Sequence, residues 1–250
     1  MNQIFSFIKK LLNRKKTTTL KTEKISESIS GNELADAKII TREHHNVSKT
    51  NISDNALKVL NRLTSQNQKA YLVGGSVRDL SLGQSPKDFD IATNALPNLV
   101  RKLFRNSRII GRRFKLVHVL FYRDIIEVAT FRKAASKQSS EDNKTNQHGM
   151  VTADNSYGTI QEDVWRRDLS INALYYDHKN STIIDFVNGV EDLNNKIIRI
   201  IGDPLLRYEE DPVRILRVIR FASKLNFTIE EKTQLAIAQK AHLLAEVPSS

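Results

Sequence analysis

The stretch Ala70-Tyr-Leu-Val-Gly-Gly-Ser-Val-Arg-Asp79, followed by Lys87-Asp-Phe-Asp-Ile91, decides the fold of this 250-residue chain. The apolar run Tyr71 to Val73 predicts a buried strand, and the two glycines after it let the backbone turn tightly against a bound group. Ser76 is expected to cap the helix that follows. A helix N-terminus beside a Gly-Gly turn points free N–H groups at an anion, and Arg78 adds a fork of donors suited to phosphate.

The second stretch predicts a strand on which Asp88 and Asp90 lie two residues apart. Alternate side chains of a strand share one face, so these carboxylates would lie side by side. Two carboxylates beside a phosphate-binding turn make a site for one or two Mg²⁺ ions. Taken singly, the glycine pair is also an ordinary turn and Asp-Phe-Asp an exposed strand edge, but their proximity favours function. The chain has no Gly-x-x-x-x-Gly-Lys-Ser/Thr loop, which argues against a P-loop nucleotide hydrolase.

Composition narrows the class of protein. A chain of 250 residues with 40% hydrophobic residues allows one large or two small domains with a real core. Lys and Arg outnumber Asp and Glu by 39 to 28, and the formal charge of +11 indicates a nucleic acid or another anionic partner. The absence of cysteine excludes disulfides, thiolate metal sites and cysteine nucleophiles. No apolar run approaches the ~18 residues of a membrane span and no secretory signal is present, so a cytoplasmic protein is expected.

Residues 1–50 predict a basic, disordered extension ahead of the folded part. Residues 1–19 are basic, and the apolar side chains among residues 4–16 fall near one helical stripe. This pattern is compatible with an amphipathic helix in peripheral contact with a membrane, a transit-like peptide, a basic arm for RNA or a disordered tail. Residues 17–50 are polar and predict a linker.

Residues 51–176 are expected to form the first folded domain. A hairpin is predicted from Val117 to Phe131, and within it Glu127 is a carboxylate in an apolar strand. Such a charge is costly unless it is paired or binds a cation, so Glu127 is either a third acid near the metal ions or a solvent-facing residue of an edge strand. Residues 133–158 are almost free of apolar side chains and predict a long mobile loop, which is either a passive insertion or a loop that grips substrate.

A polar cluster follows that loop. A helix is predicted from Leu169 to Tyr176, with Arg167, Asp168 and Asn172 on one face of it. Such a cluster offers hydrogen bonds to ribose hydroxyls and phosphates, and its alternative is a helix-capping network.

Residues 177–250 are expected to complete the first domain and then to form helices. Asp211-Pro212 is a strong helix start, and the helix from Val213 to Leu225 carries Arg214, Arg217 and Arg220 at three-residue spacing. Asp211 and Arg214 can bracket the edge of a base, or they can form an i,i+3 ion pair on a solvated face. A last helix is predicted from Ile229 to Val247, with Thr228 as its cap.

The two opening stretches, Gly74-Gly-Ser-Val-Arg-Asp79 and Asp88-Phe-Asp90, resemble the signature of the class II nucleotidyltransferases, which include the bacterial poly(A) polymerases and the tRNA CCA-adding enzymes. The resemblance spans roughly residues 54–246, with several motifs in the family's order. It implies an α+β fold, in which a palm-like mixed sheet with helices forms a head and an α-helical neck follows.

The resemblance also implies the site residues. Asp88 and Asp90 would hold a two-metal Mg²⁺ site, and Glu127 would be the third catalytic acid. The nucleotide, ATP, would be bound by Gly74, Gly75 and Arg78 at the triphosphate, Arg167, Asp168 and Asn172 at the ribose, Asp211 and Arg214 at the base edge, and Arg217 with Arg220 at the phosphates. The partner would be an RNA 3′ end, and the protein a monomer.

Two stretches, residues 87–94 and 103–118, resemble the poly(A) polymerase branch, so template-independent addition of AMP to RNA 3′ ends is the expected activity. The first alternative is a tRNA CCA-adding enzyme. The second is a catalytically silent RNA-binding protein that keeps the fold. That alternative is suggested because family members continue with helical RNA-binding domains where this sequence stops, at Ser249-Ser250.

Overall fold

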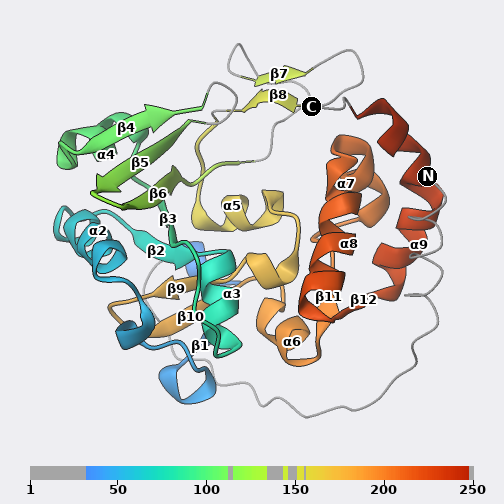
Figure 1. Ribbon diagram of the computed structural model, residues 1–250, viewed down its shortest axis with the longest axis horizontal. Coiled ribbons are helices and arrows are strands. Elements are labelled where there is room, and N and C mark those ends of the chain that lie inside the picture. Colours follow the sequence, from blue (N-terminus) through green and yellow to red (C-terminus); the bar gives the residue numbers. More distant parts are fainter. Residues whose placement is uncertain (1–31, 112–114, 134–142, 146–150, 155, 248–250) are drawn as a thin grey trace.

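A mixed sheet forms the centre of the structure. This computed structural model describes residues 32–111, 115–133, 143–145, 151–154 and 156–247. Within these residues the sheet has eight strands in the order β1-β10-β9-β2-β3-β6-β5-β4. Helices α7, α8 and α9 stand together beside it (Figure 1). The α+β class predicted from the sequence, a sheet with helices followed by a helical part, is confirmed.

The sheet is antiparallel except at its middle, where β3 and β6 run parallel. Its strands are β1 (Lys38–Ile40), β2 (Ala70–Val73), β3 (Asp90–Thr93), β4 (Ser107–Ile110), β5 (Leu116–Phe121), β6 (Asp124–Thr130), β9 (Tyr175–Asp177) and β10 (Thr182–Asp185). Two short pairs lie outside it: β7 (Asn143–Thr145) with β8 (Val151–Asp154), and β11 (Ile197–Ile198) with β12 (Thr228–Ile229).

One face of the sheet is buried by helices α2 (Asp54–Ser65) and α4 (Pro97–Leu103). Alternate residues of β5 and β6 point into this core, among them Val119 and Ile126, which are fully buried. Helix α2 begins where the Ser53 hydroxyl accepts a hydrogen bond from the Ala56 N–H at 3.2 Å. The intervening residues of the same strands are only partly buried, so the opposite face is available for a site.

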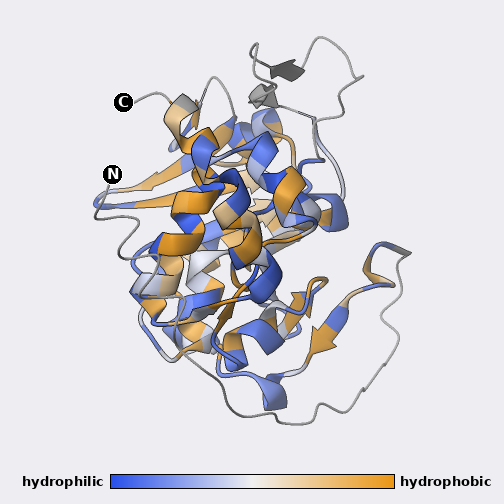
Figure 2. Ribbon diagram, turned by 90° about the vertical axis from the view of Figure 1, so that its right-hand side faces the viewer, coloured by the Kyte–Doolittle hydropathy of each residue, from blue (hydrophilic) through white to orange (hydrophobic). Residues whose placement is uncertain are grey.

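The remaining helices are α3 (Gly75–Ser81), α5 (Ile160–Arg166), α6 (Gly189–Asn194), α7 (Pro204–Glu210), α8 (Val213–Leu225) and α9 (Glu231–Lys240). Helix α8 buries Ile215, Val218 and Ala222, which recur at helical spacing. Figure 2 shows the matching mixture of hydrophobic and hydrophilic residues along the helices. No helix among the described residues is long and apolar enough to cross a membrane.

Two segments expected to lack structure contain strands. In the predicted linker, Lys38 to Ile40 form β1, which pairs with β10 at the edge of the sheet. The apolar pair Ile39-Ile40 is too short to stand out in a polar stretch, and pairing supplies the missing stabilisation. In the predicted loop 133–158, β7 and β8 form an antiparallel pair. Residues 4–16, with their predicted amphipathic helix, lie outside the described residues.

Three local predictions were wrong. Ser76 lies inside α3 and donates to the Val73 carbonyl at 3.0 Å, while Gly74 occupies the cap position. The predicted helix from Leu169 to Tyr176 is one short turn followed by β9, because Tyr175 and Tyr176 pair with neighbouring strands. Pairing of aromatic residues in a sheet overrides their helical spacing. The last helix starts after β12, with Glu230 as its cap in place of Thr228, and it ends at Lys240 before a 3₁₀ segment, Ala241–Glu246.

Candidate active site

Two carboxylates, those of Asp90 and Glu127, lie side by side at the junction of the parallel strands, and Asp88 lies two residues before Asp90. Asp90 is the first residue of β3 and pairs in register with Glu127 of β6. Asp88 precedes the strand and is exposed, so the prediction that it lies on the strand was wrong. β6 is an interior strand, which excludes the alternative in which Glu127 lies on an edge strand. Because residues paired in register share a face, Asp90 and Glu127 project from the same side of the sheet.

The ionisation of Asp90 reflects this crowding. Burial, the charge of Glu127 and that of Asp88 together raise its pKa to about 6, although Arg167 acts in the opposite direction. A carboxyl group in this setting resists ionisation until a cation offsets the neighbouring negative charge. The site is therefore suited to binding a cation.

Asp88 and Asp90 offer the hard oxygen ligands that Mg²⁺ prefers, with Glu127 beside them. No group of three or more His, Asp or Glu side chains within the described part of the chain is arranged as a preformed metal cluster. Mg²⁺ typically binds through one or two carboxylates, water and substrate phosphates, so two protein carboxylates fit this ion.

The Gly-Gly turn comes close to the carboxylates, as the sequence predicts. Gly74 has φ of +76°, a conformation that favours glycine, and a Cβ atom there would lie 4.0 Å from Asp90 Oδ2 and 3.9 Å from Arg167 Nη1. At Gly75, a Cβ atom would lie 3.5 Å from Arg78 Nη2. The turn thus lies between Asp90 and two guanidinium groups.

Arg78 is buried beneath the turn. Its Nη1 donates to Asn172 Oδ1 at 2.6 Å and its Nε to Asp79 Oδ1 at 2.8 Å, and its side chain is 4% exposed. The guanidinium also lies over the ring of Phe221 on α8. These contacts fix Arg78 between α3, the turn at Asn172 and the helical part.

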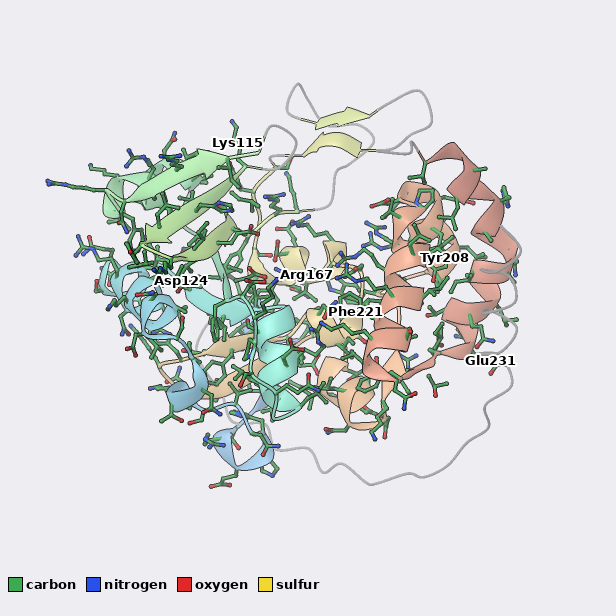
Figure 3. The ribbon with its side chains drawn as sticks, in the orientation of Figure 1. Lys115, Asp124, Arg167, Tyr208, Phe221 and Glu231 are labelled. Atoms are coloured by element: carbon green, nitrogen blue, oxygen red, sulfur yellow. The ribbon has the colours of Figure 1, made fainter. Side chains whose placement is uncertain are left out.

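Arg167 is held in a buried network centred on Asp163. Arg167 Nη2 lies 2.9 Å from Asp163 Oδ2, and its Nε donates to the Tyr175 hydroxyl at 2.8 Å. Asp163 also accepts from the Tyr175 hydroxyl, from Arg166 and from the backbone N–H of Arg132. Figure 3 shows Arg167 between the sheet and α8. The spacing of four residues between Asp163 and Arg167 is the sequence signal that could have predicted this pair.

Asp168 and Asn172 reach the site without the predicted helix. Asp168 forms an ion pair with Arg217 of α8, and Asn172 is bonded by Arg78. The structure therefore brings these residues together through arginines from other elements. Phe221, which contacts both Arg78 and Arg217, is absent from the site predicted from the sequence.

The start of α8 contradicts one of the two interpretations of the sequence, the ion pair between Asp211 and Arg214. Arg214 pairs with Glu210 at 2.7 Å and donates to the Arg207 carbonyl at 2.9 Å, and Asp211 accepts from the Val213 N–H. An ion pair between Asp211 and Arg214 is therefore not formed. Arg220 is exposed, with its guanidinium 5.9 Å from the Phe221 ring centroid.

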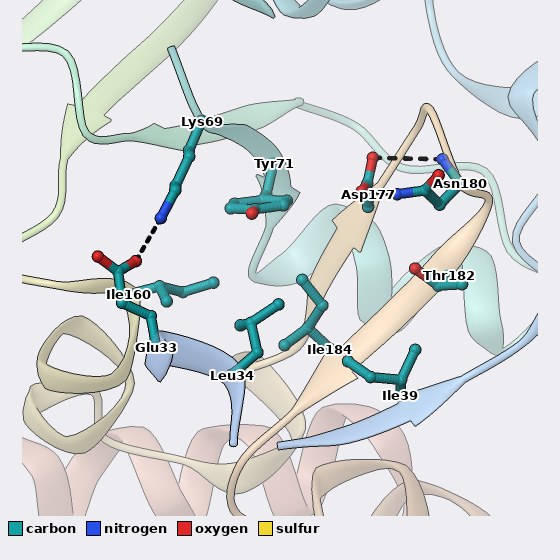
Figure 4. A pocket seen from close by; sticks show the side chains of 10 residues that line it. All are labelled: Glu33, Leu34, Ile39, Lys69, Tyr71, Ile160, Asp177, Asn180, Thr182 and Ile184. Atoms are coloured by element: carbon teal, nitrogen blue, oxygen red, sulfur yellow. Dashed lines mark hydrogen bonds and ion pairs between the residues drawn. The ribbon is translucent and has the colours of Figure 1, made fainter. Parts of the chain in front are cut away.

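A pocket elsewhere on the molecule is separate from this site. Its ten lining residues include Tyr71, Ile160 and Ile184, with an ion pair between Lys69 and Glu33 at 2.6 Å (Figure 4). None of the predicted site residues lines it.

The sequence and the fold are similar to those of known proteins. Residues 70–199 match the family described as the poly A polymerase head domain. Poly(A) polymerase I of Salmonella typhi is 53% identical over 214 residues, covering 84% of this chain and 46% of that protein. The CCA-adding enzyme of Lactobacillus helveticus is 42% identical over 192 residues, covering 77% of this chain and 46% of that protein. The crystal structure of the Bacillus stearothermophilus CCA-adding enzyme in complex with CTP superposes with a TM-score of 0.66 at 36% identity, covering 77% of this chain and 44% of that chain.

The fold is thus that of the head and adjoining helices of a nucleotidyltransferase. The chain belongs to the family of the poly A polymerase head domain, among the class II nucleotidyltransferases. It spans about half the length of the curated relatives that it matches.

Proposed function

We propose that this chain carries the catalytic part of an RNA nucleotidyltransferase that adds AMP from ATP to RNA 3′ ends without a template. The observation that carries the proposal is the pairing of Asp90 with Glu127 beside the Gly74 turn, where the crowded carboxylates favour a cation. The higher identity to poly(A) polymerase I than to the CCA-adding enzyme supports ATP as the substrate. We extend the proposal to a monomer that acts in the cytoplasm.

In the proposed reaction the RNA 3′-hydroxyl attacks the α-phosphorus of ATP. A bond forms between the 3′ oxygen and the α-phosphorus, the bond to the bridging oxygen breaks, pyrophosphate leaves and the hydroxyl proton passes to water. Asp88 and Asp90 would hold Mg²⁺, which when bound supplies positive charge to the reacting oxygens. Glu127, paired with Asp90, would be the third acid. The residues of the chain therefore contribute alignment and fixed charge.

The nucleotide-binding residues would act around this centre. Arg167 and the Gly74 turn lie next to Asp90. The triphosphate would bind to Gly74, Gly75 and Arg78 there, and Arg167 would face the ribose. Asp168 and Asn172 would contact the ribose, and the start of α8 would read the base through Asp211 and Arg214. Reading by Arg214 requires its guanidinium to exchange Glu210 for the base edge.

The pH dependence of the rate follows from Asp90, whose pKa is raised to about 6. At limiting Mg²⁺ we expect AMP incorporation to rise with pH through this range and then level off, because the ionised carboxylate binds the cation. A tenfold increase in Mg²⁺ should move the midpoint to lower pH by up to about one unit, because the cation and the proton compete for the same group. A midpoint that is insensitive to Mg²⁺ would contradict this role of Asp90.

The substrate is tested by supplying each NTP separately to a plain RNA and to a tRNA that lacks its CCA end. A long ladder with ATP alone on the plain RNA supports the proposal. Addition of two C residues and one A residue, on the tRNA only, would identify a CCA-adding enzyme in its place. RNA binding with no extension of either RNA would favour the catalytically silent alternative.

A further inference from the structure

The residues proposed to bind ATP all lie on one side of Asp90. The Gly74 turn follows β2, and Arg167 and α8 lie beyond it. On the other side of β3 the sheet continues through β6, β5 and β4, away from α8 (Figure 1). In phosphoryl transfer the attacking and leaving oxygens are roughly in line. An RNA 3′-hydroxyl should therefore approach Asp90 from the side of β6.

A row of polar side chains crosses the sheet on that side. Asp90 pairs with Glu127, Glu127 with His118 on β5, and His118 with Arg108 on β4. Because residues paired in register project from the same face, these four side chains form one line across four strands. With neighbouring strands about 4.8 Å apart, the line is roughly 14 Å long.

This part of the face is open. The side chains of His118 and Glu127 are 26% and 40% exposed, and their nearest atoms are 3.4 Å apart. Arg108 is exposed and forms no ion pair with another described residue. Next to the row, Leu120 pairs with Ile125, and Ile125 is 51% exposed. The face thus combines a free guanidinium, an imidazole and an apolar surface.

We propose that this open face, defined by Glu127, His118, Arg108, Leu120 and Ile125, binds the RNA strand just upstream of its 3′ end. Arg108 binds a backbone phosphate, and Ile125 with Leu120 supports a base or sugar. Single-stranded nucleic acid is bound by positive groups that contact its backbone together with side chains that pack against its bases; aromatic residues commonly supply that packing, and here the aliphatic Ile125 and Leu120 would supply it. The proposal rests on the proposed function, because it takes RNA as the molecule that carries the attacking hydroxyl.

The test compares Arg108→Ala with Lys102→Ala, which removes an equal charge from an exposed position on α4, a helix that packs on the opposite face. The primary readout is the binding of a fluorescent single-stranded RNA, measured by anisotropy without ATP over a range of salt. We expect Arg108→Ala to weaken binding roughly tenfold and to lower the salt slope by about 0.7, the loss of one phosphate contact. Arg108→Lys should retain most of the affinity, and Lys102→Ala should resemble the wild type.

In AMP incorporation, Arg108→Ala should raise the KM for RNA and leave the KM for ATP within twofold. Equal effects of Arg108→Ala and Lys102→Ala on RNA binding, or no effect of either, would overturn the inference. Failure of the wild-type protein to extend RNA would count against the proposed function, and the binding comparison would still decide whether the open face holds RNA.

A second inference rests on a separate observation, the contacts of Phe221. Three guanidinium groups, those of Arg78, Arg217 and Arg220, lie 5.0, 5.8 and 5.9 Å from its ring centroid. Guanidinium groups at such distances are attracted to an aromatic face. Figure 3 shows Phe221 on the side of α8 that faces α3.

Two of these arginines hold the residues proposed to contact ribose. Arg78 donates to Asn172 at 2.6 Å, and Arg217 pairs with Asp168. We infer that Phe221 is a positioning residue that orients Asn172 and Asp168 through the two arginines. It therefore sets the discrimination between ATP and 2′-deoxyATP, a role that rests on the proposed function.

The test compares Phe221→Leu, which keeps apolar volume but removes the ring, with Phe221→Tyr, which keeps the ring. We expect Phe221→Leu to raise the KM for ATP several-fold, to change kcat less and to reduce the preference for ATP over 2′-deoxyATP. Phe221→Tyr should keep the KM for ATP and the preference for ATP over 2′-deoxyATP near their wild-type values. Equal behaviour of the two variants, or an equal loss with both nucleotides, would overturn the inference. Calorimetric binding of the two nucleotides gives the same comparison without turnover, so failure of RNA extension alone would count only against the proposed function.

Discussion

Replacing Asp90 with asparagine should reduce AMP incorporation by roughly a thousandfold or more, because the carboxylate that places charge at the reacting atoms is lost.

The same variant should be more stable than the wild type above pH 6. A carboxyl group whose pKa is raised on folding stabilises the protein below its unfolded pKa, and this contribution is lost as pH rises through the folded value, here about 6. Removal of the charge should recover roughly 1–3 kcal/mol of unfolding free energy at pH 7.5. Single-turnover incorporation and thermal unfolding measure the two effects.

Asp54→Asn is the matched control, because Asp54 is an exposed acid in the first turn of α2, away from the site. It should leave both the rate and the stability near those of the wild type. Retention of more than about a tenth of the activity by Asp90→Asn would contradict a catalytic role, since loss of a single charge-stabilising group typically costs 10²–10³. A large loss of stability would mean that misfolding explains the inactivity.

Replacing Asp163 with alanine should cost roughly 3–5 kcal/mol of unfolding free energy, the effect of leaving one partner of a buried ion pair uncompensated. The side chain of Asp163 is 3% exposed and is the common partner of Arg166, Arg167 and Tyr175. Burial alone would raise its pKa, but Arg167, Arg166 and the hydrogen bonds from Tyr175 and Arg132 lower it to about 2. The contribution of the Asp163 carboxylate to the free energy of unfolding is therefore present above the pKa that Asp163 has in the unfolded chain, and it is lost as pH falls toward 2. Chemical denaturation of the variant and the wild type at pH 7 and pH 3 measures both the loss of unfolding free energy and its dependence on pH.

The control is Glu209→Ala, which breaks the more exposed ion pair of Glu209 with Lys240. Exposed pairs contribute about 0–1 kcal/mol, so this change should be small. If the two variants lost equal stability, Asp163 would not be the anchor of Arg167. Loss of activity in Asp163→Ala at a temperature where it remains folded would show that the anchor also positions Arg167 for the reaction.

Short-range sequence patterns predicted much of the fold, because the burial of an apolar run and the start of a helix depend mainly on residues that are close in sequence. The run Tyr71 to Val73 and the hairpin containing Glu127 form strands where their apolar patterns indicate. The helix predicted after Asp211-Pro212 is α8, but Pro212 takes the cap position predicted for Asp211, and Asp211 ends α7. The predictions failed where pairing between distant segments decides the outcome. Tyr175 and Tyr176 are strand residues because β2 and β10 flank them, and Lys38 to Ile40 form a strand only at the edge of β10.

The candidate site likewise has features that the local sequence predicts and features that depend on residues distant in sequence. The proximity of Asp90 to the Gly74 turn follows from the antiparallel pairing of β2 with β3, which are joined through α3 and place Asp90 opposite Val73, so neighbouring strand signals in the sequence predict it. Asp163 was missed although its spacing to Arg167 is a local signal, because nothing in the local sequence shows that the pair is buried. Phe221 was missed because one aromatic residue among arginines has no distinctive local pattern. Their importance arises from partners that are distant in sequence, such as Tyr175 for Asp163 and Arg78 for Phe221.

The central claim, transfer of AMP to an RNA 3′-hydroxyl, is tested most directly by incubating this chain with ATP, Mg²⁺ and a 5′-labelled RNA. A matched RNA that ends in a 3′-deoxynucleotide is run in parallel, and the products are separated by length. We predict a ladder on the RNA with a free 3′-hydroxyl and none on the 3′-deoxy RNA. Failure to extend the RNA with a free 3′-hydroxyl, or equal consumption of ATP with both RNAs, would contradict the claim.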